Sequence, residues 1–123
     1  MYKRQSSLTG ATAKELADGY SASSGRPWTQ PIGFKHALFE VVADVIKRSE
    51  DLDNPGAIVS AIKETDLDTI VGQVNWAKGP INNVTKTPLV GGQWQRDGDG
   101  IDLKIVANGA APNIPLTGEL ALL

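Results

Sequence analysis

Cysteine is absent from this chain of 123 residues. Its absence excludes disulfide frameworks, catalytic thiols and thiolate metal sites, although cysteine-free proteins occur in both oxidising and reducing compartments. Long apolar runs are missing as well. None approaches the about 20 residues that span a bilayer, so we expect no membrane-spanning helix. The basic start at Lys3 and Arg4 is not followed by an apolar segment, which argues against a signal peptide in this chain.

An excess of charge of one sign is also lacking. The chain has 12 Lys and Arg against 14 Asp and Glu, with a formal net charge of -2 and a pI near 5.3. Because such a chain as a whole does not attract a phosphate backbone, we expect no nucleic-acid partner. Hydrophobic residues make up 41% of the sequence, which is typical of one folded domain or part of one.

Two short helices are predicted from their capping residues. Thr12 and Glu15 have the spacing of a capping box, which predicts a helix over 12–23. Asn54-Pro55 combines a good cap with a residue suited to the first turn, which predicts a helix over 55–64.

The strongest periodic pattern predicts a longer amphipathic helix over 31–49. Its apolar residues step by three and four: Phe34, Ala37, Leu38, Val41, Val42, Val45 and Ile46. On the polar side, His36 and Glu40 stand one turn apart and are expected to form a solvated ion pair.

The second half of the chain changes from helical to strand patterns. Short segments with β-branched or alternating residues predict strands over 68–76, 87–95 and 101–107. The Asp- and Gly-rich residues 96–100 predict a tight hairpin turn between the last two strands. Prolines in 109–123 predict an extended tail.

This order of elements predicts an α/β protein that is incomplete on its own. Three short strands form only a small sheet. One face of the long helix and one sheet edge should need a partner that the chain does not contain.

The acidic and histidine residues do not form a recognisable catalytic or metal site. The spacing of Asp97, Asp99 and Asp102 resembles part of a calcium loop, but Ile101 falls at a ligand position and no closing Glu follows. His36 has no partner spaced to form a triad. We therefore expect no enzyme and no metal, and an enzyme using His36, Asp97 or Asp99 is the alternative that substitution of these residues tests.

The start of the long helix is the best candidate for a binding site. A helix N-terminus offers free amide donors and partial positive charge, which suits a carboxylate, and Gly33 would let a ligand approach closely. Gln30, Gly33 and Phe34 are the candidate ligand-binding residues. A simple helix start with Phe34 in the core remains the alternative.

Several sequence blocks together resemble one known family. They are Trp28-Thr29-Gln30-Pro31-Ile32-Gly33-Phe34, His36-Ala37-Leu38-Phe39-Glu40-Val41, Leu67-Asp68-Thr69-Ile70-Val71-Gly72, Lys86-Thr87-Pro88-Leu89-Val90-Gly91-Gly92-Gln93-Trp94 and Ala111-Pro112-Asn113-Ile114-Pro115. They resemble the carboxyl-terminal third of the substrate-binding proteins of ABC importers, in the branch of the branched-chain amino acid receptors, over about 8–123. Gln73 departs from the family pattern, in which Pro often follows the Gly.

The resemblance implies a periplasmic-binding-protein-like fold with two α/β lobes joined by three hinge crossings. Residues 6–30 would end the second lobe, 31–77 would belong to the first lobe, and 78–123 would form a hinge crossing and return strands with the tail. The turn from Gln30 to Phe34 would then lie beside the cleft.

The resemblance also implies a function. The parent protein would be a periplasmic, non-enzymatic receptor without a cofactor, which captures a small amino acid or an aromatic or aliphatic carboxylate. It would deliver this ligand to the membrane permease of an ABC importer. The alternative is a ligand-sensing module of a receptor or regulator with the same lobes, which neighbouring permease and ATPase genes would argue against.

The first residues suggest a further expectation about the origin of the chain. Tyr2-Lys3-Arg4-Gln5 resembles a translated transposon adapter of a sequencing library. We therefore expect residues 1–5 to be non-native and the chain to be a fragment, which the nucleotide sequence of codons 2 to 5 tests.

Overall fold

The computed structural model describes residues 4–122 and contains both helices and sheet. The chain divides into two compact units, with the boundary between Thr87 and Pro88. Every α-helix in the described part of the chain lies in the first unit, 4–87.

Helix α1 spans Ala13–Ser24, one residue later at each end than predicted. The capping box is confirmed, because the Thr12 hydroxyl accepts from the Glu15 amide at 3.2 Å and the Glu15 carboxylate accepts from the Thr12 amide at 2.8 Å. The helix ends at Gly25, which adopts the left-handed conformation that favours glycine. Local chemistry therefore sets both ends of α1.

Acid should loosen the start of α1. Hydrogen bonds from the backbone and then the hydroxyl of Thr12 hold the pKa of the Glu15 carboxyl below its ordinary value. Since the folded pKa lies below the unfolded one, this stabilisation is fully present above the unfolded pKa and is lost as pH falls through the folded pKa. An NMR titration of the Thr12 and Glu15 amides measures the transition. Glu15→Gln keeps an acceptor for the cap and should abolish the pH dependence; an unchanged acid transition in this variant would contradict the assignment.

Helix α3 spans Pro55–Lys63, within one residue of its prediction. The Asn54 side chain accepts from the Gly56 amide at 2.8 Å, which confirms Asn54 as the cap. Pro55 occupies the first turn, where its missing N–H leaves no helical bond unmade.

Helix α2 spans Gln30–Arg48, close to the predicted 31–49, and of the predicted apolar stripe it buries Ala37 and Val45. Its buried residues are Gly33, Ala37, Glu40 and Val45. The large apolar residues of the predicted stripe are instead mostly exposed, among them Phe34, Leu38, Val42 and Ile46. Within the first unit this side of α2 is left exposed.

The single strand predicted over 68–76 is wrong. Strands β1, Asp66–Thr69, and β2, Gly72–Asn75, form an antiparallel hairpin in which Thr69 pairs with Gly72. Gly72 has a φ of 121°, a conformation that side chains other than glycine rarely adopt. The two turn residues are apolar and face the protein interior to different degrees: Ile70 is only 2% exposed, and Val71 is half-buried.

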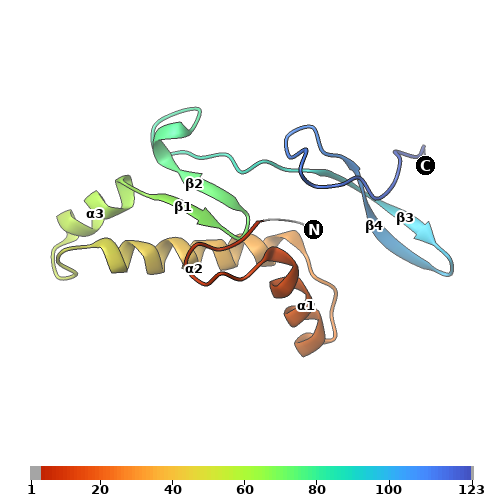
Figure 1. Cartoon of the computed structure of the whole chain (residues 1–123), viewed down its shortest axis with the longest axis horizontal. Coiled ribbons are helices and arrows are strands. Elements are labelled where there is room, and N and C mark those ends of the chain that lie inside the picture. Colours follow the sequence, from red (N-terminus) through yellow and green to blue (C-terminus); the bar gives the residue numbers. More distant parts are fainter. Residues whose placement is uncertain (1–3, 123) are drawn as a thin grey trace. The chain divides into compact units, whose positions relative to one another are not determined.

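The core of this unit lies between α2, α3 and the β1–β2 hairpin. Figure 1 shows α2 running along the hairpin, with α3 following at the end of α2. The buried apolar side chains of the unit are Ala37, Val45, Ala61, Leu67, Ile70 and Val74. After β2, a short 3-10 helix, η1, spans Trp76–Lys78.

The second unit, 88–122, is built on one hairpin. Strands β3, Gly91–Asp97, and β4, Gly100–Ala107, pair antiparallel around a turn, which confirms the predicted hairpin. Strand β3 begins four residues later than predicted, and a register shift between Gly91 and Gly92 marks a bulge at its start. As expected, the tail after Asn108 contains no helix or strand up to residue 122.

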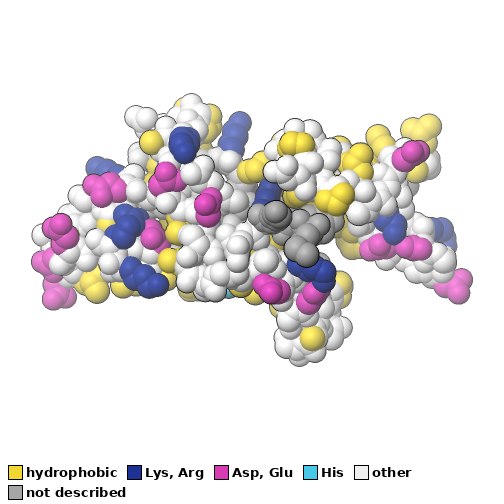
Figure 2. Space-filling model, viewed as in Figure 1, with side chains coloured by type: hydrophobic (Ala, Val, Ile, Leu, Met, Phe, Trp, Pro, Cys, Tyr) yellow, Lys and Arg dark blue, Asp and Glu magenta, His cyan; other side chains and the backbone are white. Residues whose placement is uncertain are grey.

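The surface carries charges of both signs. In Figure 2, acidic and basic side chains lie intermingled over the region of α3 and the β1–β2 hairpin. Among the described residues, no helix has the length and apolar character needed to span a membrane.

Candidate functional site

The first turn of α2 offers fewer free amides than a helix N-terminus usually does. Thr29 is the cap residue, but its side chain makes no capping hydrogen bond. Pro31 has no N–H, and the Ile32 amide donates to the Thr29 carbonyl at 3.1 Å. Of the first three helical residues, only Gln30 therefore has a backbone amide available to an anion.

Gly33 is buried beneath an aromatic side chain. A Cβ atom at this position would lie 3.1 Å from Cζ2 of Trp28 and 3.4 Å from Cγ1 of Val71. Trp28 in turn packs edge-to-face with Tyr20, with ring centroids 6.1 Å apart. The close approach that we expected a ligand to make at Gly33 is made here by the Trp28 indole.

The other two candidate residues remain accessible. Gln30 is exposed and Phe34 is 38% exposed. They are four residues apart on α2, so they share one side of the helix. The turn can therefore present a carboxamide and one amide donor beside an aromatic ring, a combination that suits a small carboxylate with an apolar part.

A second candidate place is a polar pocket of about 400 Å³ in the first unit. It is lined by Arg4, Gln5, Ser6, Ser7, Asp68, Thr69 and Gly72. Ser7 closes one side, since its amide and hydroxyl both donate to the Asp68 carbonyl, at 2.9 and 3.1 Å. The pocket includes two of the residues expected to be non-native, while residues 1–3 lie outside the described part of the chain.

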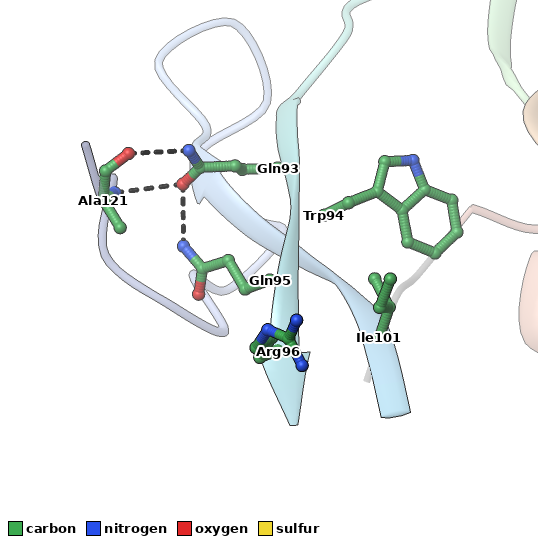
Figure 3. Close-up of a pocket in the computed structure, with 6 residues that line it drawn as sticks. All are labelled: Gln93, Trp94, Gln95, Arg96, Ile101 and Ala121. Atoms are coloured by element: carbon green, nitrogen blue, oxygen red, sulfur yellow. Dashed lines mark hydrogen bonds between the residues drawn. The ribbon is translucent and has the colours of Figure 1, made fainter. Parts of the chain in front are cut away.

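A third place is a pocket of about 420 Å³ on the β3–β4 hairpin. It is lined by Gln93, Trp94, Gln95, Arg96, Ile101 and Ala121. Figure 3 shows the Gln93 and Gln95 side chains directed toward the tail at Ala121, while Trp94 lies on the other side of β3. No sequence motif pointed to this pocket, because the tail residue reaches it from far along the chain.

The acidic residues of the β3–β4 hairpin are engaged by a lysine. Lys104 Nζ lies 2.7 Å from an oxygen of Asp97 and 2.9 Å from one of Asp102. The hydrogen bond to Lys104 lowers the pKa of the Asp102 carboxyl, and hydrogen bonds to Asp97 and Asp102 raise the pKa of Lys104. Within residues 4–122, no group of three or more metal-ligating side chains is placed to hold an ion.

Glu40 is a buried residue that sequence reasoning placed wrongly. It is 5% exposed, and its Oε2 accepts a hydrogen bond from the Ile70 amide at 3.0 Å. The expected solvated ion pair with His36 is therefore not formed among the described residues. The sequence did contain an indication of this buried side, since Gly33, Ala37 and Glu40 follow one another at helical spacing. Together they form a narrow stripe of small and polar residues.

The candidate places thus differ in chemistry: an open helix start, a polar pocket and a pocket with an aromatic wall and an arginine. The first contains the residues predicted from the sequence, and the third contains a tryptophan that is 60% exposed. Comparison of the chain with models of known families, with curated proteins and with solved structures finds no significant match.

Proposed function

We propose that this chain is part of a two-lobed receptor that captures a small amino acid or a related carboxylate and delivers it to the permease of an ABC importer. The proposal joins the resemblance of the sequence blocks to one observation, the open apolar side of α2. In this proposal the chain itself catalyses no reaction.

The observation that carries the proposal is that α2 leaves large apolar side chains exposed beside the side that it packs. One side packs against the β1–β2 hairpin and α3. The other side bears large apolar residues that are between 38% and 71% exposed: Phe34, Leu38, Phe39, Val42 and Ile46. Large apolar side chains gathered on an exposed surface mark a place where another part of a protein or a partner packs.

The free energy that burial of these side chains would contribute supports a stable packing partner over this side of α2. Removing the remaining exposed area of each of these side chains from water would contribute roughly 1 kcal/mol per residue. A sheet layer from the rest of a lobe would bury all of them at once, as helices covering the face of a parallel sheet do. We propose that this layer is supplied by upstream residues of the parent receptor.

The ligand would meet the chain at the first turn of α2. We propose that Gln30 donates to the ligand carboxylate and that Phe34 supplies an apolar wall. Gly33 contributes by letting Trp28 pack against the helix, which holds the turn in place. The other groups that recognise the ligand would come from the lobe that faces this turn.

This function is tested by measuring ligand binding to the full-length parent receptor by calorimetry. A panel of amino acids and aromatic acids should contain at least one that binds. Gln30→Ala and Phe34→Ala should each weaken its binding about tenfold, the scale of one good hydrogen bond or one apolar contact. Glu50→Ala, exposed beyond the other end of α2, is the matched control and should leave affinity unchanged. Unchanged affinity in both test variants would remove these residues from the site, and the absence of any binding would reject the receptor itself.

A further inference from the structure

The tail returns to the β3–β4 hairpin and lies across one of its faces. Gln93 pairs with Lys104 and Gln95 pairs with Asp102, so these four side chains share one face of the hairpin. Residues 117–121, here called the strap, contact this face. The Thr117 amide donates to the Ile105 carbonyl at 2.9 Å, and the Thr117 hydroxyl accepts from the Ile105 amide at 2.8 Å.

The two glutamines hold the strap by its main chain. Gln93 Nε2 donates to the Ala121 carbonyl at 2.7 Å, and Gln93 Oε1 accepts from the Ala121 amide at 3.0 Å (Figure 3). Gln95 Nε2 donates to the Glu119 carbonyl at 2.6 Å and to Gln93 Oε1 at 2.8 Å. The glutamines are two residues apart on β3, and they bind residues that are two apart on the strap, which matches the repeat of an extended chain.

The side chains of the strap contribute little to these contacts. Glu119 is exposed, and Leu120 is 73% exposed. Where the strap crosses the hairpin at Lys104, only glycine fits at position 118, because a Cβ atom there would lie 2.8 Å from Cβ of Lys104. Docking of the strap therefore depends on main-chain atoms, on the Thr117 hydroxyl and on one close approach, and hardly on the identity of residues 119–121.

From this arrangement we propose that Gln93 and Gln95 form a binding site for the main chain of an extended peptide. In the structure the chain's own strap fills it, and an extended peptide supplied by another molecule can replace the strap. When a peptide adds to a sheet edge, its main-chain hydrogen bonds supply the affinity. Here the two glutamine side chains, on a face of the hairpin, supply the partners of such main-chain hydrogen bonds.

The other face of the hairpin, which the strap does not cover, carries the remaining residues that line this pocket. Trp94 and Ile101 offer apolar surface, being 60% and 69% exposed. The Arg96 guanidinium has no hydrogen-bond or ion-pair partner within residues 4–122. The hairpin also gains from an occupant, since an isolated two-stranded hairpin is only marginally stable in water.

A full-length variant with an undocked strap tests the site directly. Gly118→Val should displace the strap through its clash with Lys104. The probe is the capped peptide Thr-Gly-Glu-Leu-Ala-Leu, which has the sequence of residues 117–122. It should bind this variant at least about tenfold more tightly than the unsubstituted chain, where the tethered strap competes at high effective concentration. NMR chemical-shift titration measures both affinities and reports whether the β3–β4 amides keep their native shifts.

Two controls separate main-chain recognition from adhesion of leucine side chains. The same peptide methylated on its alanine nitrogen lacks the donor to Gln93 Oε1, and its binding should fall about tenfold. Adding Gln93→Leu to the Gly118→Val variant should abolish the difference between the two peptides. Equal binding of the two peptides to the Gly118→Val variant, or no binding while the hairpin shifts stay native, would overturn the proposal.

A second measurement decides the matter if Gly118→Val unfolds the hairpin. In the otherwise unsubstituted chain, Gln93→Leu should raise the hydrogen-exchange rate of the Ala121 amide about tenfold. Leu120→Ser should leave that rate unchanged. If Leu120→Ser releases the strap as much as Gln93→Leu does, side chains hold it and the proposed site is wrong.

Discussion

Replacing Ile70 with alanine should lower the free energy of unfolding of the first unit by about 2–5 kcal/mol, the range measured for such truncations in packed cores. Ile70 is 2% exposed at the turn between β1 and β2, and its amide is bonded to Glu40 of α2. Truncation leaves a cavity at the contact that joins the hairpin to the helix. The loss is large against the roughly 4–12 kcal/mol typical of a unit of this size.

Urea unfolding followed by circular dichroism at the helical minimum measures this loss, because the described helices all lie in the first unit. Ile81→Ala is the matched control, since Ile81 belongs to the same unit and is 67% exposed. We expect it to change the free energy by less than about 0.5 kcal/mol. Similar losses in the two variants would mean that Ile70 is not a core residue.

The helices were predicted to within one residue at each end because residues close to each end determine where a helix begins or stops. The Thr12–Glu15 box and the Asn54–Pro55 pair act over three residues or fewer. Such contacts form in the same way whatever the rest of the chain does. Local chemistry of this kind is what a single sequence shows best.

The β1–β2 hairpin was missed because its turn carries no turn residues at its centre. Ile70 and Val71 are β-branched residues typical of strands, and they occupy the turn because α2 covers it. The Thr69 hydroxyl donates to the Gly72 carbonyl at 2.7 Å and accepts from the Val71 amide at 3.3 Å, which supports the turn. Gly72 is the residue that could have indicated a turn here. Its neighbours are apolar because they pack in the folded protein, so the segment resembles a single strand in the sequence.

The side that α2 buries was predicted only in part: Ala37 and Val45 are buried, whereas the larger residues of the stripe are exposed. Periodicity favours the side with the largest apolar residues, whereas the hairpin approaches over Gly33 and Ala37, which are small enough to allow it. This larger side stays exposed in the first unit. Where apolar residues lie on more than one side of a helix, spacing alone does not say which side the rest of the chain covers.

The candidate sites also divide into one that a local sequence motif predicts and one that depends on residues far apart in the sequence. Gln30 and Phe34 were predicted from a short motif, and the structure leaves both accessible. The strap was not predicted, because Gln93 and Gln95 bind main-chain atoms 28 and 24 residues away. A side chain that binds a backbone leaves no matching residue type in the sequence to be recognised.

Glu40→Ala should destabilise the first unit by about 1–3 kcal/mol, the cost of leaving a buried donor without its acceptor. The carboxylate is 5% exposed and accepts the Ile70 amide at 3.0 Å, so its removal leaves that amide buried and unpaired. Urea unfolding gives the energy, and hydrogen exchange at the Ile70 amide shows whether the loss begins there.

Glu40→Gln distinguishes loss of the acceptor from loss of the charge. The glutamine oxygen can still accept from the Ile70 amide, so this variant should keep slow exchange at that position and lose less stability than Glu40→Ala. If both variants exchange equally fast, the charge of Glu40 matters and its acceptor geometry does not. Slow exchange in both would mean that the Ile70 amide is protected by burial alone. In the expected case a single helix carboxylate fixes the turn of the hairpin, and with it the side of α2 that stays exposed in the first unit.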